Sequence, residues 1–353
     1  MSEQSETSHP VLPGAEPFSA QGGANGALVL HGFTGCPQSM RPVAEALAAA
    51  GFTVELPLLP GHGTTVADML TTGWEDWTSA AETAYDQLAA RCARVVAVGL
   101  SMGGTLVCWL AARHPELAGL VCVNPAVEPP ADSFIELLDG MLASGGETMP
   151  AIGSDVAKPG VTELAYDATP IAPLKSLMQA VADLEPKLAA IAAPLLLFTS
   201  PQDHVVPPTA SDLLAARVSG SVERVICERS YHVATLDYDG PEIAARTVEF
   251  AKKVTGISRA DVAHVARLAR LDLTEDELEQ FTEQLGAVLE HARDVEALDT
   301  AGVPPTAHPL PLRNVLRDDV EVPSLDRSEV LAQAPDAQDG RFFRVPRILE
   351  EEA

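Results

Sequence analysis

The chain has 353 residues and is strongly acidic: its 50 Asp and Glu outnumber 23 Lys and Arg, which gives a formal net charge of −27. This charge argues against extensive direct binding to a nucleic-acid backbone and against docking on an anionic membrane, because both need a basic face. The length predicts two domains, and 46% hydrophobic residues with 5% aromatic residues predict globular domains with aliphatic cores.

The first eight residues are polar and lack the apolar core of a secretion signal, and no apolar run approaches a membrane span. The spacing of the five cysteines is not that of a metal site. Several of them lie in apolar runs, which indicates buried thiols in a reducing compartment. The five are Cys36, Cys92, Cys108, Cys122 and Cys227. We therefore expect a cytoplasmic protein without a metal and without membrane attachment.

Strands and helices alternate along the first two thirds of the chain. Residues 1–16 are polar, contain Pro and Gly, and are expected to form a disordered tail. Apolar runs then predict strands at 27–30, 52–56, 95–98, 120–123, 195–199 and 222–227, and amphipathic or apolar stretches predict helices at 40–50, 76–92, 105–113, 209–218 and 241–254. This order predicts an α/β domain over 17–254 with a doubly wound, mostly parallel sheet.

The alternation is interrupted between about residue 125 and residue 193. This insertion carries many apolar residues, among them Ile135, Leu138, Met149, Leu174 and Leu177. Two interpretations are possible: a cap that covers a site, or an ordinary helical insertion packed on the sheet. We favour the cap, because ligand pockets are mostly apolar.

The sequence Gly99-Leu100-Ser101-Met102-Gly103 lies between an apolar strand and an apolar helix. In that context Gly-x-Ser-x-Gly forms a sharp turn that presents the serine as a nucleophile, and the two glycines relieve clashes with strand and helix. A chance pentapeptide in a strand–helix turn is the alternative, and the flanking elements favour the nucleophile.

A serine hydroxyl needs a histidine to take its proton and a carboxylate to orient that histidine. Asp203 follows the predicted strand at 195–199, and His232 lies just beyond the strand at 222–227. Each could be an ordinary loop residue, but together they stand in the order Ser, acid, His that this fold requires. His204 follows the wrong strand to be the base.

The oxyanion of a tetrahedral intermediate needs two N–H donors. The backbone N–H of Met102 is one candidate, and Phe33, in the glycine-containing loop 31–35, is the other. A glycine-rich turn without a ligand is the alternative for that loop. His31 and His62 are expected to orient loops rather than to do chemistry.

These motifs resemble the α/β-hydrolase family of carboxylesterases and monoacylglycerol-lipase-like enzymes, from about residue 17 to residue 254. The resemblance rests on LHGFTG (30–35), GHG (61–63), GLSMGG (99–104), Asp203 and YHVATLD (231–237). It implies hydrolysis of carboxylic esters through an acyl-serine intermediate, under a small cap and without a cofactor. Thioesterase and haloperoxidase-like relatives share the triad, so the leaving group and the acyl acceptor stay open.

The last hundred residues have a different composition. Ser258 and Thr274 are predicted to cap two amphipathic helices. The longer helix carries a stripe made of Leu278, Phe281, Leu285, Val288, Leu289, Ala292, Val295 and Leu298. The stretch from Gly302 to Pro323 is punctuated by proline and cannot form a core of its own, so it is expected to stay disordered or to wrap a partner. The composition indicates a binding module.

This stretch, residues 257–353, resembles the C subunit of the aspartyl/glutamyl-tRNA(Asn/Gln) amidotransferase. The matching segments are VAHVARLARL (262–271), GVPP (302–305), APD (334–336) and GRFFRVPRIL (340–349). The resemblance implies an assembly subunit that joins the amidase and transfer subunits, while ATP, Mg²⁺, glutamine and tRNA are handled by the complex. A generic helical pair with a disordered tail is the alternative.

Only Thr255 and Gly256 separate the two parts. Domain linkers are usually longer and more polar, so the joint indicates either a genuine fusion with restricted geometry or two neighbouring genes read as one. We predict a bifunctional chain.

Overall fold

The structure, a computed structural model, describes residues 9–257, 259–296 and 316–345. By its internal contacts the chain divides into two compact units, residues 1–296 and 297–353. This division groups the first two helices of the predicted C-terminal module with the preceding domain, whereas the sequence placed the boundary at residue 256.

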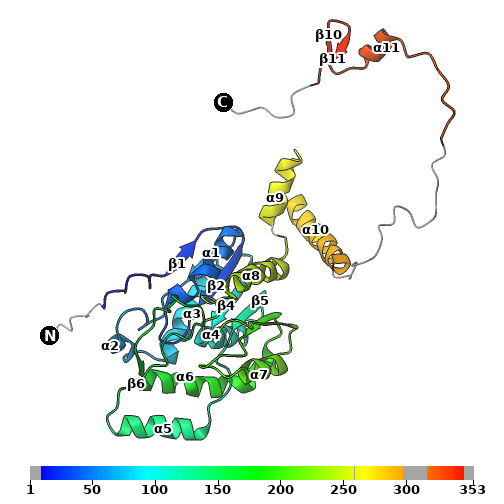
Figure 1. The fold of residues 1–353 in the computed structure, drawn as a ribbon. Helices are drawn as coiled ribbons and strands as arrows, with labels where there is room; N and C mark the ends of the chain where they lie inside the picture. Colours follow the sequence, from blue (N-terminus) through cyan, green and yellow to red (C-terminus); the bar gives the residue numbers. More distant parts are fainter. Residues whose placement is uncertain (1–8, 258, 297–315, 346–353) are drawn as a thin grey trace. The chain divides into compact units, whose positions relative to one another are not determined.

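The first unit is built on a seven-stranded sheet (Figure 1). Its strands lie in the order β1 (Phe18–Ala20), β3 (Thr53–Leu56), β2 (Asn25–Leu30), β4 (Arg94–Leu100), β5 (Gly119–Val123), β8 (Leu195–Thr199) and β9 (Val222–Ile226). All neighbours pair in parallel except β1, which pairs antiparallel with β3. The predicted doubly wound, mostly parallel sheet is confirmed. The edge strand β1, only three residues long, was not predicted.

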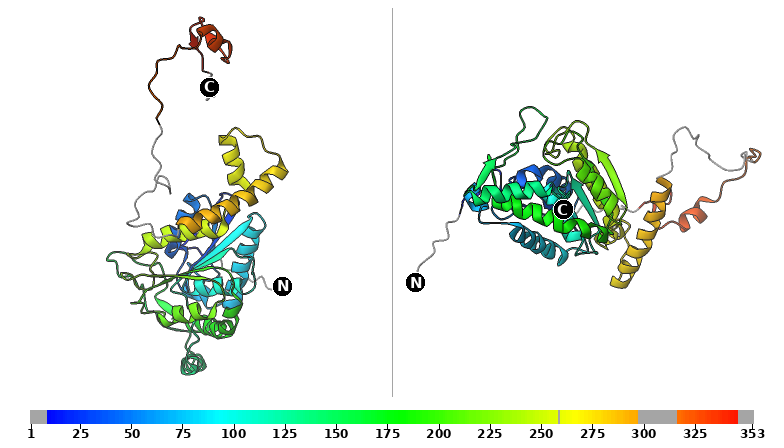
Figure 2. Two further views of the ribbon diagram at one scale, coloured as in Figure 1. Left: turned by 90° about the vertical axis from the view of Figure 1, so that its right-hand side faces the viewer. Right: turned by 90° about the horizontal axis from the view of Figure 1, so that it is seen from below.

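Helices cover both faces of this sheet (Figure 2). One face carries α3 (Trp74–Ala89), α4 (Met102–Ala111), α6 (Ile171–Leu184) and α7 (Thr209–Arg217), and the other carries α1 (Arg41–Ala49) and α8 (Gly240–Thr255). Along β2, Leu28 and Leu30 enter the first core, while Ala27 and Val29 enter the second. This alternation follows from the period of two in a strand.

The insertion between β5 and β8 contains α5 (Asp132–Ala143), the hairpin of β6 (Thr148–Pro150) and β7 (Ala168–Pro170), then α6 and a 3₁₀ helix over Glu185–Ala190. We call residues 125–193 the cap. A short helix, α2 (Val66–Met69), follows β3 in the chain.

The expectation of a disordered tail over residues 1–16 is wrong for residues 9–16. The N–H of Leu12 donates to the carbonyl of Gly63 at 2.8 Å, and Ala15 is fully buried. The guanidinium of Arg41 donates to the carbonyl of Glu16. Paired backbone groups hold this stretch in spite of its polar composition. Residues 1–8 lie outside the described part.

Two amphipathic helices follow: α9 (Arg259–Leu268) and α10 (Glu275–Glu296). At the start of α10, the N–H of Thr274 donates to Glu277 Oε2 at 2.9 Å, and the N–H of Glu277 donates to Thr274 Oγ1 at 3.3 Å, so the predicted capping box is present. Ser258, the side chain of Val295, Leu298 and residues 302–315 of the proline-rich stretch lie outside the described residues.

The described part of the second unit contains α11 (Arg327–Ala332) and a short hairpin of β10 (Ala337–Gln338) and β11 (Phe342–Phe343). These elements were not predicted. Among the residues the structure describes, no helix has the length and apolarity needed to cross a membrane.

Candidate functional site

Ser101 stands at the turn between β4 and α4, with φ 55° and ψ −119°. A positive φ is costly for a residue with a side chain, and it is maintained here by tight packing around the turn. A Cβ at Gly99 would stand 2.2 Å from the backbone of Gly103, and a Cβ at Gly103 would stand 2.2 Å from the carbonyl oxygen of Leu30. Only glycine fits at both positions, as the motif predicted.

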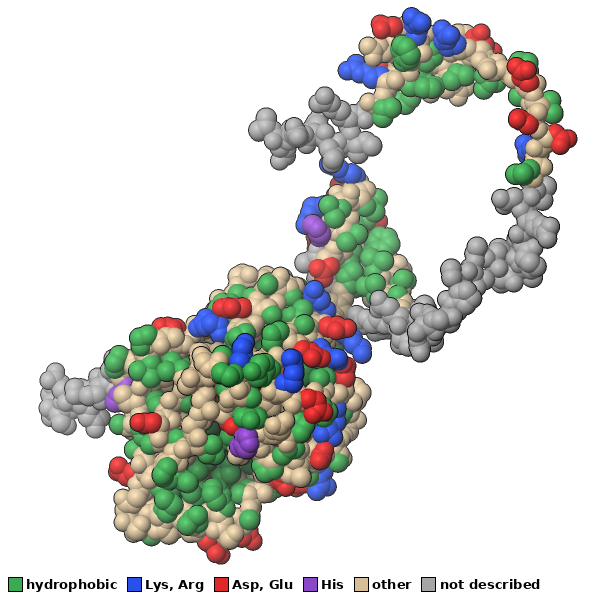
Figure 3. Space-filling model, viewed as in Figure 1, with side chains coloured by type: hydrophobic (Ala, Val, Ile, Leu, Met, Phe, Trp, Pro, Cys, Tyr) green, Lys and Arg blue, Asp and Glu red, His purple; other side chains and the backbone are tan. Residues whose placement is uncertain are grey.

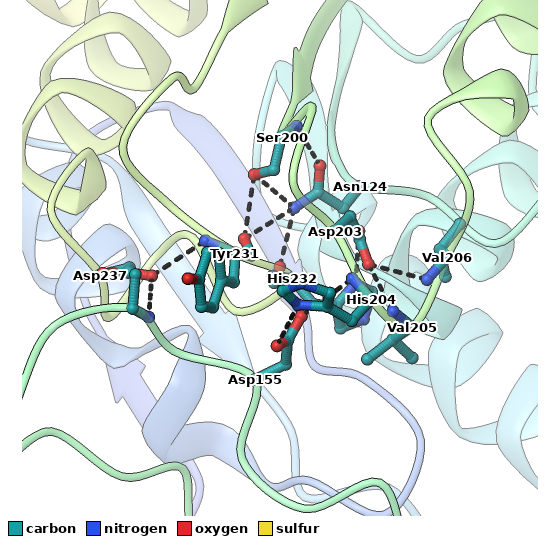
Figure 4. A network of polar contacts seen from close by, with 11 residues as sticks. Asn124, Asp155, Ser200, Asp203, His204, Val205, Val206, Tyr231, His232 and Asp237 are labelled. Atoms are coloured by element: carbon teal, nitrogen blue, oxygen red, sulfur yellow. Dashed lines mark hydrogen bonds and ion pairs between the residues drawn. The ribbon is translucent and has the colours of Figure 1, made fainter.

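His232 and Asp203 are brought together from two loops that are 29 residues apart in the chain. Nδ1 of His232 lies 2.7 Å from Oδ2 of Asp203, and both side chains are almost fully buried (Figure 4). The second carboxylate oxygen of Asp203 accepts the N–H groups of Val205 and Val206, each at 2.8 Å. The carboxylate is thus fixed by backbone donors, and Nδ1 donates to it, which leaves Nε2 as the free acceptor.

Ser101 and His232 line the same cavity, whose volume is about 430 Å³. Most of its other walls are apolar and come from the cap, including Phe134, Met149, Ile152, Leu174, Leu177 and Met178. Apolar side chains also gather on the surface over the cap between α5 and α6 (Figure 3). The insertion therefore has the position and the composition expected of a cap over an apolar ligand.

Both predicted oxyanion donors lie beside Ser101. Met102 is the first residue of α4, and Phe33 lines the cavity. The chain also passes close to the serine at Gly32, where a Cβ would stand 3.3 Å from Cβ of Ser101. The loop that carries Phe33 therefore runs close to the turn that carries Ser101.

His31 and His62 are fully buried, and both bond to backbone. His31 donates from Nδ1 to the carbonyl of Gly32 at 3.0 Å and accepts the N–H of Leu59 at Nε2, at 3.1 Å. Burial lowers the pKa of His31 to about 4, so its imidazole is neutral at pH 7. His62 donates to the carbonyl of Pro60 at 3.0 Å, and burial lowers its pKa as well. These contacts fit the expected role of orienting loops.

Three polar residues around the site were not predicted. Asn124 follows β5 and bonds to the loops that carry Ser200 and His232. Asp155 extends from the cap to the backbone of His232, at 3.0 Å. Glu163 is a carboxyl on the cavity wall, and burial raises its pKa. The only sequence signal was the position of Asn124 directly after an apolar strand.

The described residues contain no group of His, Cys, Asp and Glu side chains arranged to hold a metal ion. The polar side chains that line the cavity are those of Thr34, Ser101, Asp155, Glu163, Tyr166, Thr169 and His232.

Comparison with known proteins finds relatives for the first part of the chain. Residues 25–239 match the family described as serine aminopeptidase, S33. A thermostable monoacylglycerol lipase of Bacillus sp. (strain H-257) is 48% identical over 261 residues, which cover 72% of this chain and all of the relative. A structure from a study of the metagenome-derived lipolytic enzymes LipS and LipT is 42% identical, with a TM-score of 0.66; the match covers 69% of this chain and all of that one.

The second part of the chain has relatives of its own. Residues 273–345 match the family described as the Glu-tRNAGln amidotransferase C subunit. The C subunit of the aspartyl/glutamyl-tRNA(Asn/Gln) amidotransferase of Desulfitobacterium hafniense is 59% identical over 93 residues, which cover 26% of this chain and 98% of the relative. Both resemblances noted in the sequence are confirmed.

Proposed function

The chain belongs to the serine hydrolase family that matches residues 25–239 and also to the family of amidotransferase C subunits, and from this membership we propose two functions. The first domain hydrolyses carboxylic esters, with monoacylglycerols as its substrate class. The second part is an assembly subunit of a tRNA amidotransferase.

The observation that carries the first proposal is one cavity with three features. It contains the strained Ser101, it contains His232 with Nδ1 bonded to Asp203, and its remaining walls are mostly apolar. Acyl transfer needs a nucleophile that shares a cavity with a base, and a carboxylate that orients this base. An apolar wall suits the acyl chain of a lipid-like ester.

In the proposed mechanism, Oγ of Ser101 attacks the ester carbonyl carbon while Nε2 of His232 takes the hydroxyl proton. The N–H groups of Met102 and Phe33 hold the negative charge that develops on the carbonyl oxygen. His232 then gives its proton to the departing alkoxide, which leaves an acyl-serine. A water molecule, deprotonated by the same imidazole, attacks this ester and releases the acid and Ser101. No cofactor takes part in these steps.

Glu163 supports an alcohol with further hydroxyl groups as the leaving group. Its carboxyl stands in the cavity beside Gly35, where a Cβ would meet Oε1 at 2.6 Å. Ser39 already bonds to this carboxyl, and its two oxygens can accept further hydrogen bonds. A glycerol hydroxyl can supply one by donating to it, and a simple alkyl leaving group cannot.

The direct test is release of fatty acid from 1-monoacylglycerols by the full chain. Ser101→Ala is expected to lower kcat/KM by at least about 10³-fold, because the nucleophile is gone. Ser144→Ala, at an exposed serine that follows α5, is the matched control and is expected to leave the rate unchanged. Undiminished turnover in Ser101→Ala would refute the proposal.

The second function rests on the match over 98% of a relative that is such a C subunit, and on the apolar side chains that α9 and α10 expose. Figure 3 shows apolar side chains along α10, and those that are exposed there and on α9 are Val265, Leu268, Phe281, Leu285, Val288 and Leu289. We propose that residues 257–353 bind the amidase and transfer subunits in the cytoplasm. In this proposal the partner subunits use ATP, Mg²⁺ and glutamine, and tRNA binds only to the assembled complex.

Co-purification tests this second function. The full chain, expressed with amidase and transfer subunits, is expected to be recovered in one complex that contains all three proteins. Failure to bind either partner would refute it. The intact mass of the polypeptide isolated from cells, against 37.1 kDa for the whole chain, tests whether both parts are made as one protein.

A further inference from the structure

Asp155 lies in the cap, in the connection between β6 and β7, and its carboxylate contacts the loop of the proposed base. Oδ2 of Asp155 accepts the backbone N–H of His232 at 3.0 Å and that of His204 at 3.1 Å. Oδ1 lies 2.8 Å from Nδ1 of His204, and the Asp155 side chain is 10% exposed. Figure 4 shows this carboxylate beside the two histidines. A cap side chain thus bonds to the residue that would move the proton.

The same histidine is held from the opposite side by the body of the domain. Nδ2 of Asn124 donates to the carbonyl of His232 at 2.8 Å, and Oδ1 of Asn124 accepts the N–H of Ser200 at 2.8 Å. Asn124 has a φ of 44°, a conformation that asparagine tolerates better than most residues. The N–H of His232 is therefore fixed by the cap, its carbonyl by the residue that follows β5, and its ring by Asp203.

Further bonds join the cap and the histidine loop next to Asp155. The N–H of Val233 donates to the carbonyl of Asp155 at 3.1 Å. Asp237, which is 1% exposed, accepts the N–H groups of Ala157 and Lys158 from the cap and that of Tyr231 from the histidine loop, at 2.6, 2.9 and 3.0 Å. The contact of Asp155 with His232 thus belongs to a buried network.

We propose that Asp155 is a positioning residue for the hydrolase reaction, and that its carboxylate places His232 relative to Ser101 by holding the histidine N–H. This inference rests on the proposed ester hydrolysis. Removal of the carboxylate leaves a buried N–H without an acceptor, so the main chain shifts to find another partner. A displacement of about 1 Å in a reacting group costs about 10²-fold in rate. The loss should fall on kcat: Asp155 lines the cavity too, but the apolar side chains of the cavity wall stay in place.

Three substitutions in the full chain separate this role from general stability. Asp155→Ala removes the acceptor and is expected to lower kcat for p-nitrophenyl butyrate by about 10- to 100-fold, with KM changed by less than about 3-fold. Asp155→Asn keeps an oxygen that can accept the His232 N–H and is expected to restore most of kcat. Asp139→Ala is the matched control: this exposed cap carboxylate pairs with Lys175 and is expected to leave both constants unchanged.

Asp155→Glu decides the question if the alanine variant does not fold. It keeps the charge and the acceptor but lengthens the side chain by one carbon, so a positioning role predicts a lower kcat and a merely structural role does not. The rate at which a fluorophosphonate labels Ser101 should fall in parallel, because that step also needs His232 as the base. A KM effect alone would overturn the inference, and so would a kcat within about 2-fold of wild type in Asp155→Glu and in Asp155→Ala where that variant folds.

Ser101→Ala, measured in the same assay, separates the two levels of the proposal. If it is inactive while the Asp155 variants turn over like wild type, only the positioning role fails. If it keeps its activity, the proposed hydrolysis fails, and the inference fails with it.

Discussion

A Cβ added to Gly103 would stand 2.2 Å from the carbonyl oxygen of Leu30, so the first turn of α4 is pressed against the end of β2. This close approach brings the serine turn next to the loop that carries Phe33. The relationship explains why the glycine is required and how two distant segments come to form one site.

Gly103→Ala is therefore expected to destabilise the domain and to abolish hydrolysis, because the backbone oxygen of Leu30 cannot move aside without disrupting β2. A loss of several kcal/mol is expected, on the order of an overpacked core substitution or more. Gly140→Ala is the control: this glycine lies in α5 with open space around its Cα, and alanine there should stabilise the helix by about 1 kcal/mol. Urea unfolding of both variants measures the difference, and equal stabilities would contradict this packing.

Because burial lowers the pKa of His31, we expect the domain to lose stability in mild acid. Its pKa is about 4 in the folded protein because of burial, against about 6.5 when exposed. Between these values the unfolded chain binds more protons than the folded one, so the free energy of unfolding falls as pH drops from about 6.5 to 4. The contribution is on the order of 3 kcal/mol over this range. Urea unfolding at pH 7.5, 6, 5 and 4 measures it. His31→Gln should show a shallower dependence, and an unchanged slope would contradict this assignment.

For His114 we expect the free energy of unfolding to depend on pH with the opposite sign. Burial opposes its protonation, but Glu82 at 2.7 Å and Glu116 at 3.0 Å outweigh burial and raise the pKa of His114. Its ion pairs therefore contribute stability below the unfolded pKa of about 6.5, and this stability is lost as pH rises through the raised folded value. His114→Gln should lower the melting temperature more at pH 6 than at pH 9. A larger effect at pH 9 would contradict the ion pairing.

Glu163→Leu, which removes both acceptor oxygens at similar size, tests the proposed alcohol side of the cavity. The substitution is expected to raise KM for a 1-monoacylglycerol by about 3- to 30-fold, equivalent to one hydrogen bond. The p-nitrophenyl ester of the same acid, which offers no hydroxyl to this carboxyl, should be nearly unaffected. The comparison of the two substrates within one variant removes effects on folding. Equal changes for both substrates would contradict the role.

The apolar side chains of α10 predict that partner binding depends on them. Val288 is 60% exposed in the chain alone, and Val288→Asp places a negative charge at this position. If a partner covers this position, binding of the amidase should weaken by at least about 10-fold, because a charge would be buried without a partner. Gln280→Asp, at an exposed polar position of α10, is the control. Isothermal titration measures both, and equal affinities would exclude this part of α10 from the interface.

The sheet and the positions of Ser101, Asp203 and His232 could be predicted because local signals mark them. An apolar strand, a turn motif and the order of the loops suffice to predict these positions. The carboxyl ends of parallel strands lie at the same edge of a sheet, so the loops that follow them are close together. The loop around Phe33, for which an oxyanion donor stays a prediction, follows a strand with the same kind of local signal.

Asp155, Asn124 and Glu163 could not be predicted, because their partners are far away in the sequence. Asp155 bonds to a residue 77 positions later, and Asn124 bonds to one 108 positions later. A single aspartate in a loop belongs to no sequence motif or hydrophobic repeat. Its contacts depend on how the cap folds onto the domain. The ordered structure of residues 9–16 was not predicted either. Its polar composition gives no sign of the backbone hydrogen bonds that hold it.

Mass spectrometry of the peptide that contains Ser101, after rapid acid quench of the full chain during turnover of a long-chain p-nitrophenyl ester, tests the central claim most directly. We predict a mass increase equal to the acyl group on Ser101, and no such increase in Ser101→Ala. Turnover that persists in Ser101→Ala, or an acyl group on a different residue, would contradict this prediction.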